Sequence, residues 1–203
     1  MTLEHKNLPE LASFLKTRRS HLAVTLEFPG PDSAQVQELL GMASRVPDHG
    51  KISPWRFVVY QSPQAAAIGK KLAEIAEERE GPLGENTTAM ELERFMRAPL
   101  VVGVLSSPNR DHKVPVWEQE LAVGAVCLSL LNACFSLGFA GQWLTEWYAY
   151  DDEAAAYLGA REGERFAGFL HIGSASVKPA ERPRPDVAQL TEYFEDVSSK
   201  IEA

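Results

Sequence analysis

The sequence predicts an α+β fold with about four strands among longer helices. Short apolar runs lie between proline, glycine and polar residues, as buried strands do, and they alternate with longer segments of helical periodicity. One apolar segment, residues 121–137, is longer than the others and predicts a buried central helix. The length of 203 residues suits one domain spanning 1–203.

The strands are predicted from apolar runs that are too short for helices. We expect strands at residues 56–60, 100–105, 139–144 and 166–173, of which 139–144 has an extended turn as its alternative. The intervening segments 21–31 and 106–115 are expected to be loops, and 81–88 a mobile loop, because proline, glycine and polar residues dominate them.

The helices are predicted from spacing and from capping residues. Asn7 and Glu10 have capping-box spacing, and their helix is expected to run into residues 16–20. Asp32 or Ser33 caps a second helix that must end near Val46, because a proline follows. Further helices are expected around 68–75, over 90–96, after Asp151, and as an amphipathic last helix from 187 to 201.

The central apolar segment has a membrane span as its alternative. It is slightly short for one, follows the charged stretch "WEQE" directly and ends at Gly138, so we favour a helix surrounded by protein. Its two cysteines, Cys127 and Cys134, are two turns apart, about 10 Å along the axis, which is too far for a disulfide. They are expected to be buried thiols.

The composition restricts the classes of partner that the protein is expected to bind and the cellular compartment in which it is expected. The net charge of −8 disfavours nucleic acid and an anionic membrane, both of which need basic surfaces. The first ten residues show no signal peptide, and the cysteine usage fits a reducing compartment, so a cytoplasmic protein is expected. No G-x-G-x-x-G motif follows a strand, so a Rossmann nucleotide site has no support.

Two clusters carry the types of side chain that bind anions. Arg18-Arg19-Ser20, at a predicted helix end, suits a phosphate group, although basic residues there also complement the helix dipole. The stretch "RVPDHGKISPW" places Arg45 and His49 on one rigid loop, with Asp48 expected to orient the histidine ring. The alternative for this stretch is a tight structural loop with a surface histidine.

Two further clusters flank the central helix. "HKVPVWEQE" opens it, and His112 with His49 makes a metal site the alternative, without any metal-binding motif in support. "GFAGQWLTEW" follows it, and its glycines permit close approach of the backbone to a flat ligand, with Trp143 nearby. Ordinary turn glycines are the alternative reading.

Together these clusters resemble the nitroreductase family of flavin enzymes, especially its short bacterial members. The matching stretches, in order, are "RRS", "RVPDHGKISPWRF", "APLVVGVLSS", "HKVPVWEQELAVGAVCLSLLNACFSLGFAGQW" and "GFLHIG". They span roughly residues 10–175, and the long fourth stretch is the most specific.

The resemblance implies a nitroreductase-like α+β fold, in which helices surround a central, mostly antiparallel sheet of four to five strands. It also implies a homodimer with FMN sites at its interface. It implies that FMN takes hydride from NADH or NADPH and passes it to a nitroaromatic, quinone or enone in a ping-pong cycle, without an obligatory catalytic side chain. The residues 175–203, an arm and the last helix, are expected to pack on the partner. Reductive dehalogenation, breakdown of flavin, and flavin binding without turnover are the alternatives within this resemblance.

The same resemblance implies the cofactor-binding residues. They are Arg18, Arg19 and Ser20 at the phosphate end, Arg45 and His49 at the flavin, and a later segment of Trp143, Leu144 and Thr145. Leu144 stands where close relatives carry a basic residue, and Arg182 or Arg184 is expected to replace that charge.

Overall fold

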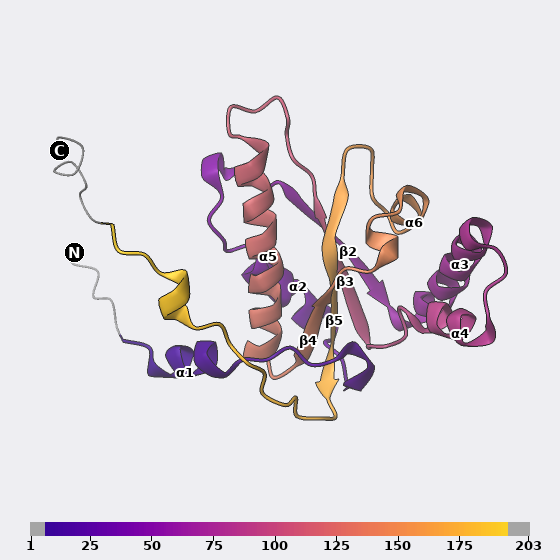
Figure 1. Ribbon diagram of the computed structural model, residues 1–203, viewed down its shortest axis with the longest axis horizontal. Coiled ribbons are helices and arrows are strands. Elements are labelled where there is room, and N and C mark those ends of the chain that lie inside the picture. Colours follow the sequence, from indigo (N-terminus) through magenta and orange to yellow (C-terminus); the bar gives the residue numbers. More distant parts are fainter. Residues whose placement is uncertain (1–6, 195–203) are drawn as a thin grey trace, which may run out of the picture.

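A five-stranded antiparallel sheet forms the centre of the computed structural model, which describes residues 7–194 (Figure 1). The strand order is β1–β5–β3–β2, and β4 also pairs with β5. The strands are β1 (Leu26–Glu27), β2 (Trp55–Gln61), β3 (Leu100–Ser106), β4 (Ala140–Leu144) and β5 (Arg165–Ala175). The predicted α+β class and the four predicted strands are therefore confirmed, and β1 is an addition within the expected loop 21–31.

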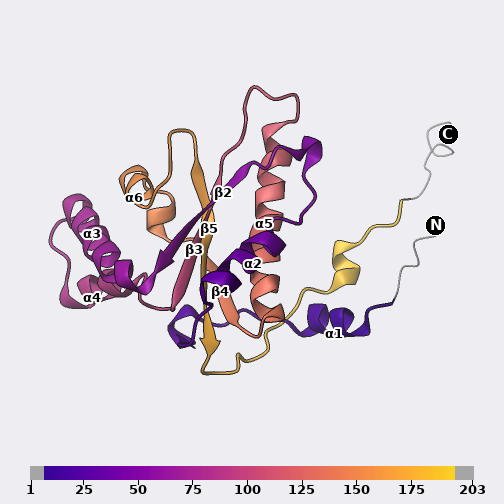
Figure 2. The ribbon, with the colours of Figure 1, turned by 180° about the vertical axis from the view of Figure 1, so that it is seen from behind.

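Helices cover both faces of the sheet (Figures 1 and 2). They are α1 (Pro9–Thr17), α2 (Ser33–Ala43), α3 (Ser62–Glu80), α4 (Glu85–Glu93), α5 (Val116–Ser136) and α6 (Asp152–Tyr157). Short 3₁₀ turns lie at Ala23–Thr25, His49–Lys51, Trp147–Ala149 and Val187–Leu190.

The alternation of β3 divides the interior into two cores. Leu100, Val102 and Val104 pack with α2 and α5 on one face, whereas Val101 and Leu105 pack with α3 and α6 on the other. Successive strand residues point to opposite faces, so a strand that is apolar throughout must be covered on both sides. That explains why the run "LVVGVL" is apolar without alternation.

The central helix was predicted correctly but is longer, and it is covered on one side only. By length and composition α5 could cross a membrane, yet it packs against α2, β3, β4 and β5 as a core helix. The expectation that protein surrounds it was wrong for the single chain, because Trp117, Leu121 and Leu128 are exposed. Both cysteines are buried, and burial raises the pKa of each thiol to about 12, so both stay protonated.

Two of the predicted helix caps are confirmed and one is wrong. Asp32 forms a capping box with Gln35, and Asp151 accepts a hydrogen bond from the backbone N–H of Ala154. The Asn7–Glu10 box does not form, because Leu8 is the N-cap residue and Pro9 begins the helix. A proline at the first helical position needs no capped N–H, so the helix can start without a side-chain cap.

α1 ends at Thr17, within the stretch 16–20 that it was expected to reach, so the arginines that follow lie just outside it. Two other helices differ from expectation. Residues 85–88 form the first turn of α4 instead of a loop, and that helix ends at Glu93 instead of 96, since polar helices show no apolar periodicity. The predicted last helix is reduced to the 3₁₀ turn Val187–Leu190, with 191–194 outside any helix; Val197 and Ile201 lie outside the described residues.

A β-bulge in β5 lies beside β4. The β3–β5 register passes from Val104–Gly168 to Leu105–Phe166, so Ala167 is the extra residue. The Ala167 carbonyl accepts a hydrogen bond from the indole N–H of Trp143 at 3.1 Å. Gly168 has φ 150°, and a Cβ there would lie 2.2 Å from the Trp143 nitrogen. The bulge and its glycine therefore hold the indole flat against β5.

Candidate active site

Four arginines converge beyond the end of α1. Arg18, Arg19 and Ser20 line a pocket of about 110 Å³ together with Arg182 and Arg184. Arg19 donates a hydrogen bond to the carbonyl of Ala180, so the pocket brings together two segments that are 161 residues apart in the sequence. The sequence predicted all five residues as cofactor-binding, but only the structure shows that they form one pocket. We call these five residues the arginine pocket.

The arginine pocket carries an excess of positive charge. Glu181 pairs with Arg19 at 3.5 Å and with Arg184 at 3.0 Å, so one carboxylate faces four guanidinium groups. Burial, followed by the charges of Arg184, Arg182 and Arg19, lowers the pKa of Arg18. The Arg18 Nε has no hydrogen-bond partner within residues 7–194. An anion would relieve this repulsion and satisfy free donors.

The polypeptide connects the arginine pocket to β4. Because α1 ends at Thr17, the chain turns sharply, and Arg18 and Ser20 approach within 3.4 Å. The N–H of His21 then donates to the Gly141 carbonyl at 3.1 Å, which anchors the segment on β4. The pocket therefore lies at the start of the strand whose last residues the sequence also singled out.

Those last residues differ in their surroundings. Trp143 and Leu144 pair with Leu170 and Phe169 of β5, and the Trp143 indole is held against β5 by the bulge. Thr145 follows the strand and is exposed. Arg182 and Arg184 line the arginine pocket, and the hydrogen bonds described for both residues are with Glu181.

The second basic cluster has a different ion pair from the one predicted. The His49 ring Nδ1 lies 2.7 Å from the Glu118 carboxylate of α5, whereas Asp48 accepts from the backbone N–H of Ser53 at 2.7 Å. The expectation that Asp48 orients the ring was therefore wrong, because its carboxylate closes the loop instead. Arg45 follows the end of α2 and is exposed.

The loop that carries His49 has an unusual backbone. Gly50, Lys51 and Ser53 have φ of 79°, 55° and 52°, in the left-handed region. Such conformations cost roughly 1–3 kcal/mol for residues other than glycine and cluster at functional sites. The loop is thus held in one shape, with the His49 side chain 64% exposed.

His49 and the arginine pocket lie at opposite ends of α5 within one chain, whereas Arg45 comes three residues after Met42, whose carbonyl accepts a hydrogen bond from Ser129 in the second half of that helix. His49 contacts Glu118 near the start of the helix, and Arg18 lies 5.9 Å from the Phe135 ring near its end. Glu118 and Phe135 are 17 residues apart, which is about 25 Å along a helix axis. Figure 1 shows this separation, with the His49 turn and α1 beside different ends of α5.

The alternative of a metal site finds no support in the geometry. Within residues 7–194, no three histidine, cysteine, aspartate or glutamate side chains group as a metal would require. The Nδ1 of His112 instead accepts from the backbone N–H of Val114 at 3.1 Å.

A buried ion network, which sequence reasoning missed, lies beside β4 on the α4 side. Glu146 accepts from Arg94 and from the Tyr148 hydroxyl, each at 2.7 Å, and it pairs with Arg97. Burial opposes its ionisation, but Arg97 and Tyr148 outweigh burial and lower the pKa of Glu146 to about 2. Arg94 and Arg97, spaced i, i+3 on a polar turn, gave no sequence signal of their shared partner Glu146, which lies about 50 residues further along the chain.

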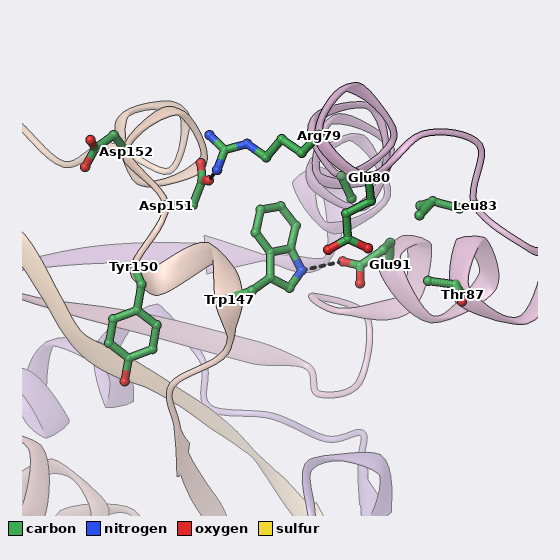
Figure 3. A pocket seen from close by; sticks show the side chains of 10 residues that line it. Arg79, Glu80, Leu83, Thr87, Glu91, Trp147, Tyr150, Asp151 and Asp152 are labelled. Carbon is green, nitrogen blue, oxygen red and sulfur yellow. Dashed lines mark hydrogen bonds and ion pairs between the residues drawn. The ribbon is translucent and has the colours of Figure 1, made fainter.

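This network borders a pocket of about 480 Å³ between α3, α4 and α6 (Figure 3). The Trp147 indole points toward Glu91 and donates to it at 3.0 Å, and Arg79 pairs with Asp151 across the pocket. None of the predicted site residues lines it, and among its charged lining residues Arg79 pairs with Asp151.

Comparison with known proteins identifies the family. The model of the nitroreductase family matches residues 15–174, so the chain belongs to that family and is an oxidoreductase. Escherichia coli K12 "Putative NAD(P)H nitroreductase YdjA" is 30% identical over 183 residues, covering 89% of this chain and 97% of that protein. A Haemophilus influenzae protein, "Putative NAD(P)H nitroreductase", is 30% identical over 171 residues, covering 84% and 90%.

Solved structures support the fold assignment. A nitroreductase-like family protein from Bacillus cereus superposes with a TM-score of 0.77 at 21% identity, covering 96% of this chain and 99% of that chain. A nitroreductase from Desulfitobacterium hafniense, solved with bound FMN, gives a TM-score of 0.64 at 19% identity, covering 93% and 100%. The predicted nitroreductase-like fold is therefore confirmed.

Proposed function

We propose that this protein is an FMN-dependent oxidoreductase that uses NADH or NADPH to reduce an electrophilic acceptor such as a nitroaromatic, quinone or enone. The observation that carries the proposal is the arginine pocket, in which four guanidinium groups face one carboxylate. The names of its curated relatives, which are NAD(P)H nitroreductases, and the FMN bound by a structural neighbour support it.

The arginine pocket fits the phosphate of FMN. A phosphate monoester carries nearly two negative charges and three acceptor oxygens at neutral pH. Arg18, Arg19, Arg182 and Arg184 supply fork-shaped donors, and Ser20 supplies a hydroxyl. The volume of about 110 Å³ suits a phosphate group and is too small for a ring system, so we propose that the ring would extend from the pocket along β4.

Bound FMN supplies the hydride chemistry, accepting hydride from NAD(P)H and passing it on in a ping-pong cycle. The protein holds the ring and stabilises charge. Arg45 and His49 have the donors to stabilise negative charge at the N1–C2=O edge, and Trp143, Leu144 and Thr145 provide a backbone edge along the ring. No side chain is assigned as an obligatory acid or base.

We further propose that each flavin site combines two chains. His49 lies about 25 Å along α5 from the arginine pocket of the same chain. A two-fold partner that packs antiparallel on the exposed side of α5 brings its own His49 turn to this chain's arginine pocket. Trp117, Leu121 and Leu128 on that side, and the exposed Val187 and Leu190 of the arm, are apolar surface for such a dimer. A cytoplasmic location remains our expectation.

An anaerobic titration tests the proposed function. Purified protein is expected to be yellow, to release FMN and not FAD on denaturation, and to lose its flavin absorbance when NADH or NADPH is added. Re-oxidation by a nitroaromatic, with product analysis, separates this activity from dehalogenation and flavin breakdown. Protein that is colourless and binds no added FMN would end the proposal, and bound flavin that neither nucleotide reduces would leave only a flavin-binding protein.

A further inference from the structure

A second pocket, of about 460 Å³, lies where β3 and β5 meet the start of α5 and α6. Its size falls within the range of roughly 300–1,000 Å³ found for small-molecule sites. Thr145 is the one predicted site residue that lines it; the others are Ser106, Glu120, Val123, Ala149, Tyr150, Asp152, Ala155, Glu164, Arg165, Phe166 and Ala167. We call it the β3-end pocket.

Ser106 lines this pocket and carries a buried hydroxyl without a protein partner in the described part of the chain. It is the last residue of β3, paired in register with Trp55 and Arg165, and only 4% exposed. Its Oγ has no hydrogen-bond partner within the described part of the chain. A buried hydroxyl without a partner costs about 1–3 kcal/mol. A serine hydroxyl turns between staggered positions about χ1, so it can donate to a ligand at this wall.

One part of the wall is apolar. Val123 of α5, Ala149, Ala155 of α6 and Phe166 of β5 contribute hydrophobic surface. The β5 bulge at Ala167 breaks the regular ladder at the same place, and bulges recur beside ligand sites because they redirect side chains. The small side chains of Ala149 and Ala155 leave room in the pocket for an apolar ligand.

The charges around the β3-end pocket select against anions. Glu120 pairs with Arg165 at 2.8 Å, and Glu164 is bound by Arg56, which lowers the pKa of Glu164 to about 2. Asp152 is the third carboxylate of the pocket, after Glu120 and Glu164. The guanidinium groups of Arg165 and Arg56 offset two of these three negative charges, which leaves a net charge of −1. A neutral ligand is therefore favoured over a carboxylate or sulfonate.

We propose that the β3-end pocket binds the neutral acceptor of this enzyme, a small flat aromatic nitro or carbonyl compound, with Ser106 as the donor to its oxygen. The inference deepens the proposed function and rests on it for the class of ligand. Thr145 connects the two, since it lines this pocket and belongs to the segment proposed to contact FMN. Ser106 is thus a specificity residue.

Binding of nitrobenzene, measured by calorimetry on the full-length protein, tests the pocket. Ala155→Phe fills it and is expected to raise the Kd at least tenfold. Ala156→Phe is the matched control, because Ala156 is the next residue of α6, is exposed and does not line the pocket. Ser106→Ala should raise the Kd about three- to tenfold, the loss of one hydrogen bond. That variant removes a hydroxyl without a partner, so it keeps the fold if Ala155→Phe does not.

The anionic analogue 4-nitrobenzoate provides the charge test. It is expected to bind at least tenfold more weakly than nitrobenzene. Wild-type protein that does not bind nitrobenzene, an Ala155→Phe protein that keeps the wild-type Kd, or 4-nitrobenzoate that binds equally well would each overturn the inference. A failed NAD(P)H reduction refutes the proposed function instead, and it leaves these binding results intact.

Discussion

His171 shows how a single buried residue sets a pH dependence. It lies in β5, is fully buried, and neither ring nitrogen has a partner within residues 7–194. Burial, together with the positive charge of Arg97, lowers the pKa of His171 to about 3. An unfolded histidine titrates near 6.5, so the unfolded state binds more protons below that pH. The free energy of unfolding therefore falls as the pH falls through this range.

Urea unfolding at pH 6.5 and pH 5.0 measures this dependence. His171 is expected to account for about 2 kcal/mol of lost stability between them, at about 1.4 kcal/mol per pH unit. His171→Phe removes the titrating ring and fits the aromatic surroundings beside Phe95, so its loss should be smaller by that amount. An equal loss in both proteins would show that His171 is not the cause.

Arg45 is the residue expected to tune the flavin. If its guanidinium group stabilises negative charge on the reduced ring, Arg45→Ala destabilises the reduced state more than the oxidised one. The midpoint potential should fall by roughly 30 mV for each 1.4 kcal/mol lost in this two-electron couple. Arg45→Lys keeps the positive charge, so the midpoint potential of that variant should fall by less. Potentiometry that finds the Arg45→Ala potential unchanged or raised would exclude this role.

At the scale of elements, the β5 bulge makes a specific demand on the sequence. A Cβ on Gly168 would lie 2.2 Å from the Trp143 Nε1 and 2.8 Å from the Leu144 carbonyl oxygen, at a φ of 150°. Gly163 also has a positive φ, 79°, but a Cβ there would meet no atom within 4 Å. A substitution at Gly168 therefore causes both steric crowding and backbone strain, whereas a substitution at Gly163 causes backbone strain alone.

Gly168→Ala is expected to lower the free energy of unfolding by more than Gly163→Ala, which should cost about 1 kcal/mol for its backbone alone. The added Cβ displaces Trp143, so Trp143→Ala should cost less in the Gly168→Ala background than in the wild type. Chemical denaturation of the four proteins measures that coupling. Equal costs for the two glycine variants would mean that the indole is not held against the bulge.

The elements that the sequence predicted well are those specified locally. The cap of α2 at Asp32 and the four longer strands depend on nearby residues and on burial, which composition and periodicity record. β1 was missed because its two residues become a strand only by pairing with β5, about 150 positions later. The last helix was overpredicted because its apolar residues, such as Val187 and Leu190, lack a surface of their own chain to bury against.

The candidate site was also predictable only in part: the residue types could be identified from the sequence, but their arrangement in space could not. Arg18, Arg19 and Ser20 could be identified from the sequence because guanidinium and hydroxyl groups are the donors that a phosphate would require, and the family resemblance implied Arg182 or Arg184 as the replacement for a missing charge. Their assembly into one pocket needed the arm to return to α1. The predicted partner of His49 was wrong, because Asp48 is adjacent in sequence whereas Glu118, which His49 contacts in the structure, is distant in sequence. Ser106 gave no sequence signal, since a serine at a strand end is ordinary.

At the scale of the whole molecule, shared sites predict complementation. A chain with Arg18→Ala and Arg19→Ala lacks the phosphate end, and a chain with Arg45→Ala and His49→Ala lacks the ring donors. If each site takes one set from each chain, the heterodimer of these two chains has one intact site and one doubly damaged site. It should bind one FMN per dimer with wild-type affinity, whereas neither homodimer should.

Co-expression with two different tags isolates that heterodimer, and FMN titration counts its sites. Wild-type protein with the same tags is the control and should bind two FMN per dimer. If both sets acted within one chain, each chain of the heterodimer would carry one damaged site. A heterodimer without any wild-type site, or a flavin-loaded monomer in light scattering, would contradict the shared arrangement.

The central claim is that the arginine pocket grips the phosphate of FMN, and paired titrations with FMN and riboflavin test it most directly. Arg18→Ala and Arg19→Ala should each weaken FMN by about 1.5–3 kcal/mol, roughly ten- to a hundredfold in Kd. Riboflavin lacks the phosphate, so its Kd should stay at the wild-type value, and Arg161→Ala, outside the pocket, should change neither. Equal losses for both ligands would contradict the account and would make the cluster structural.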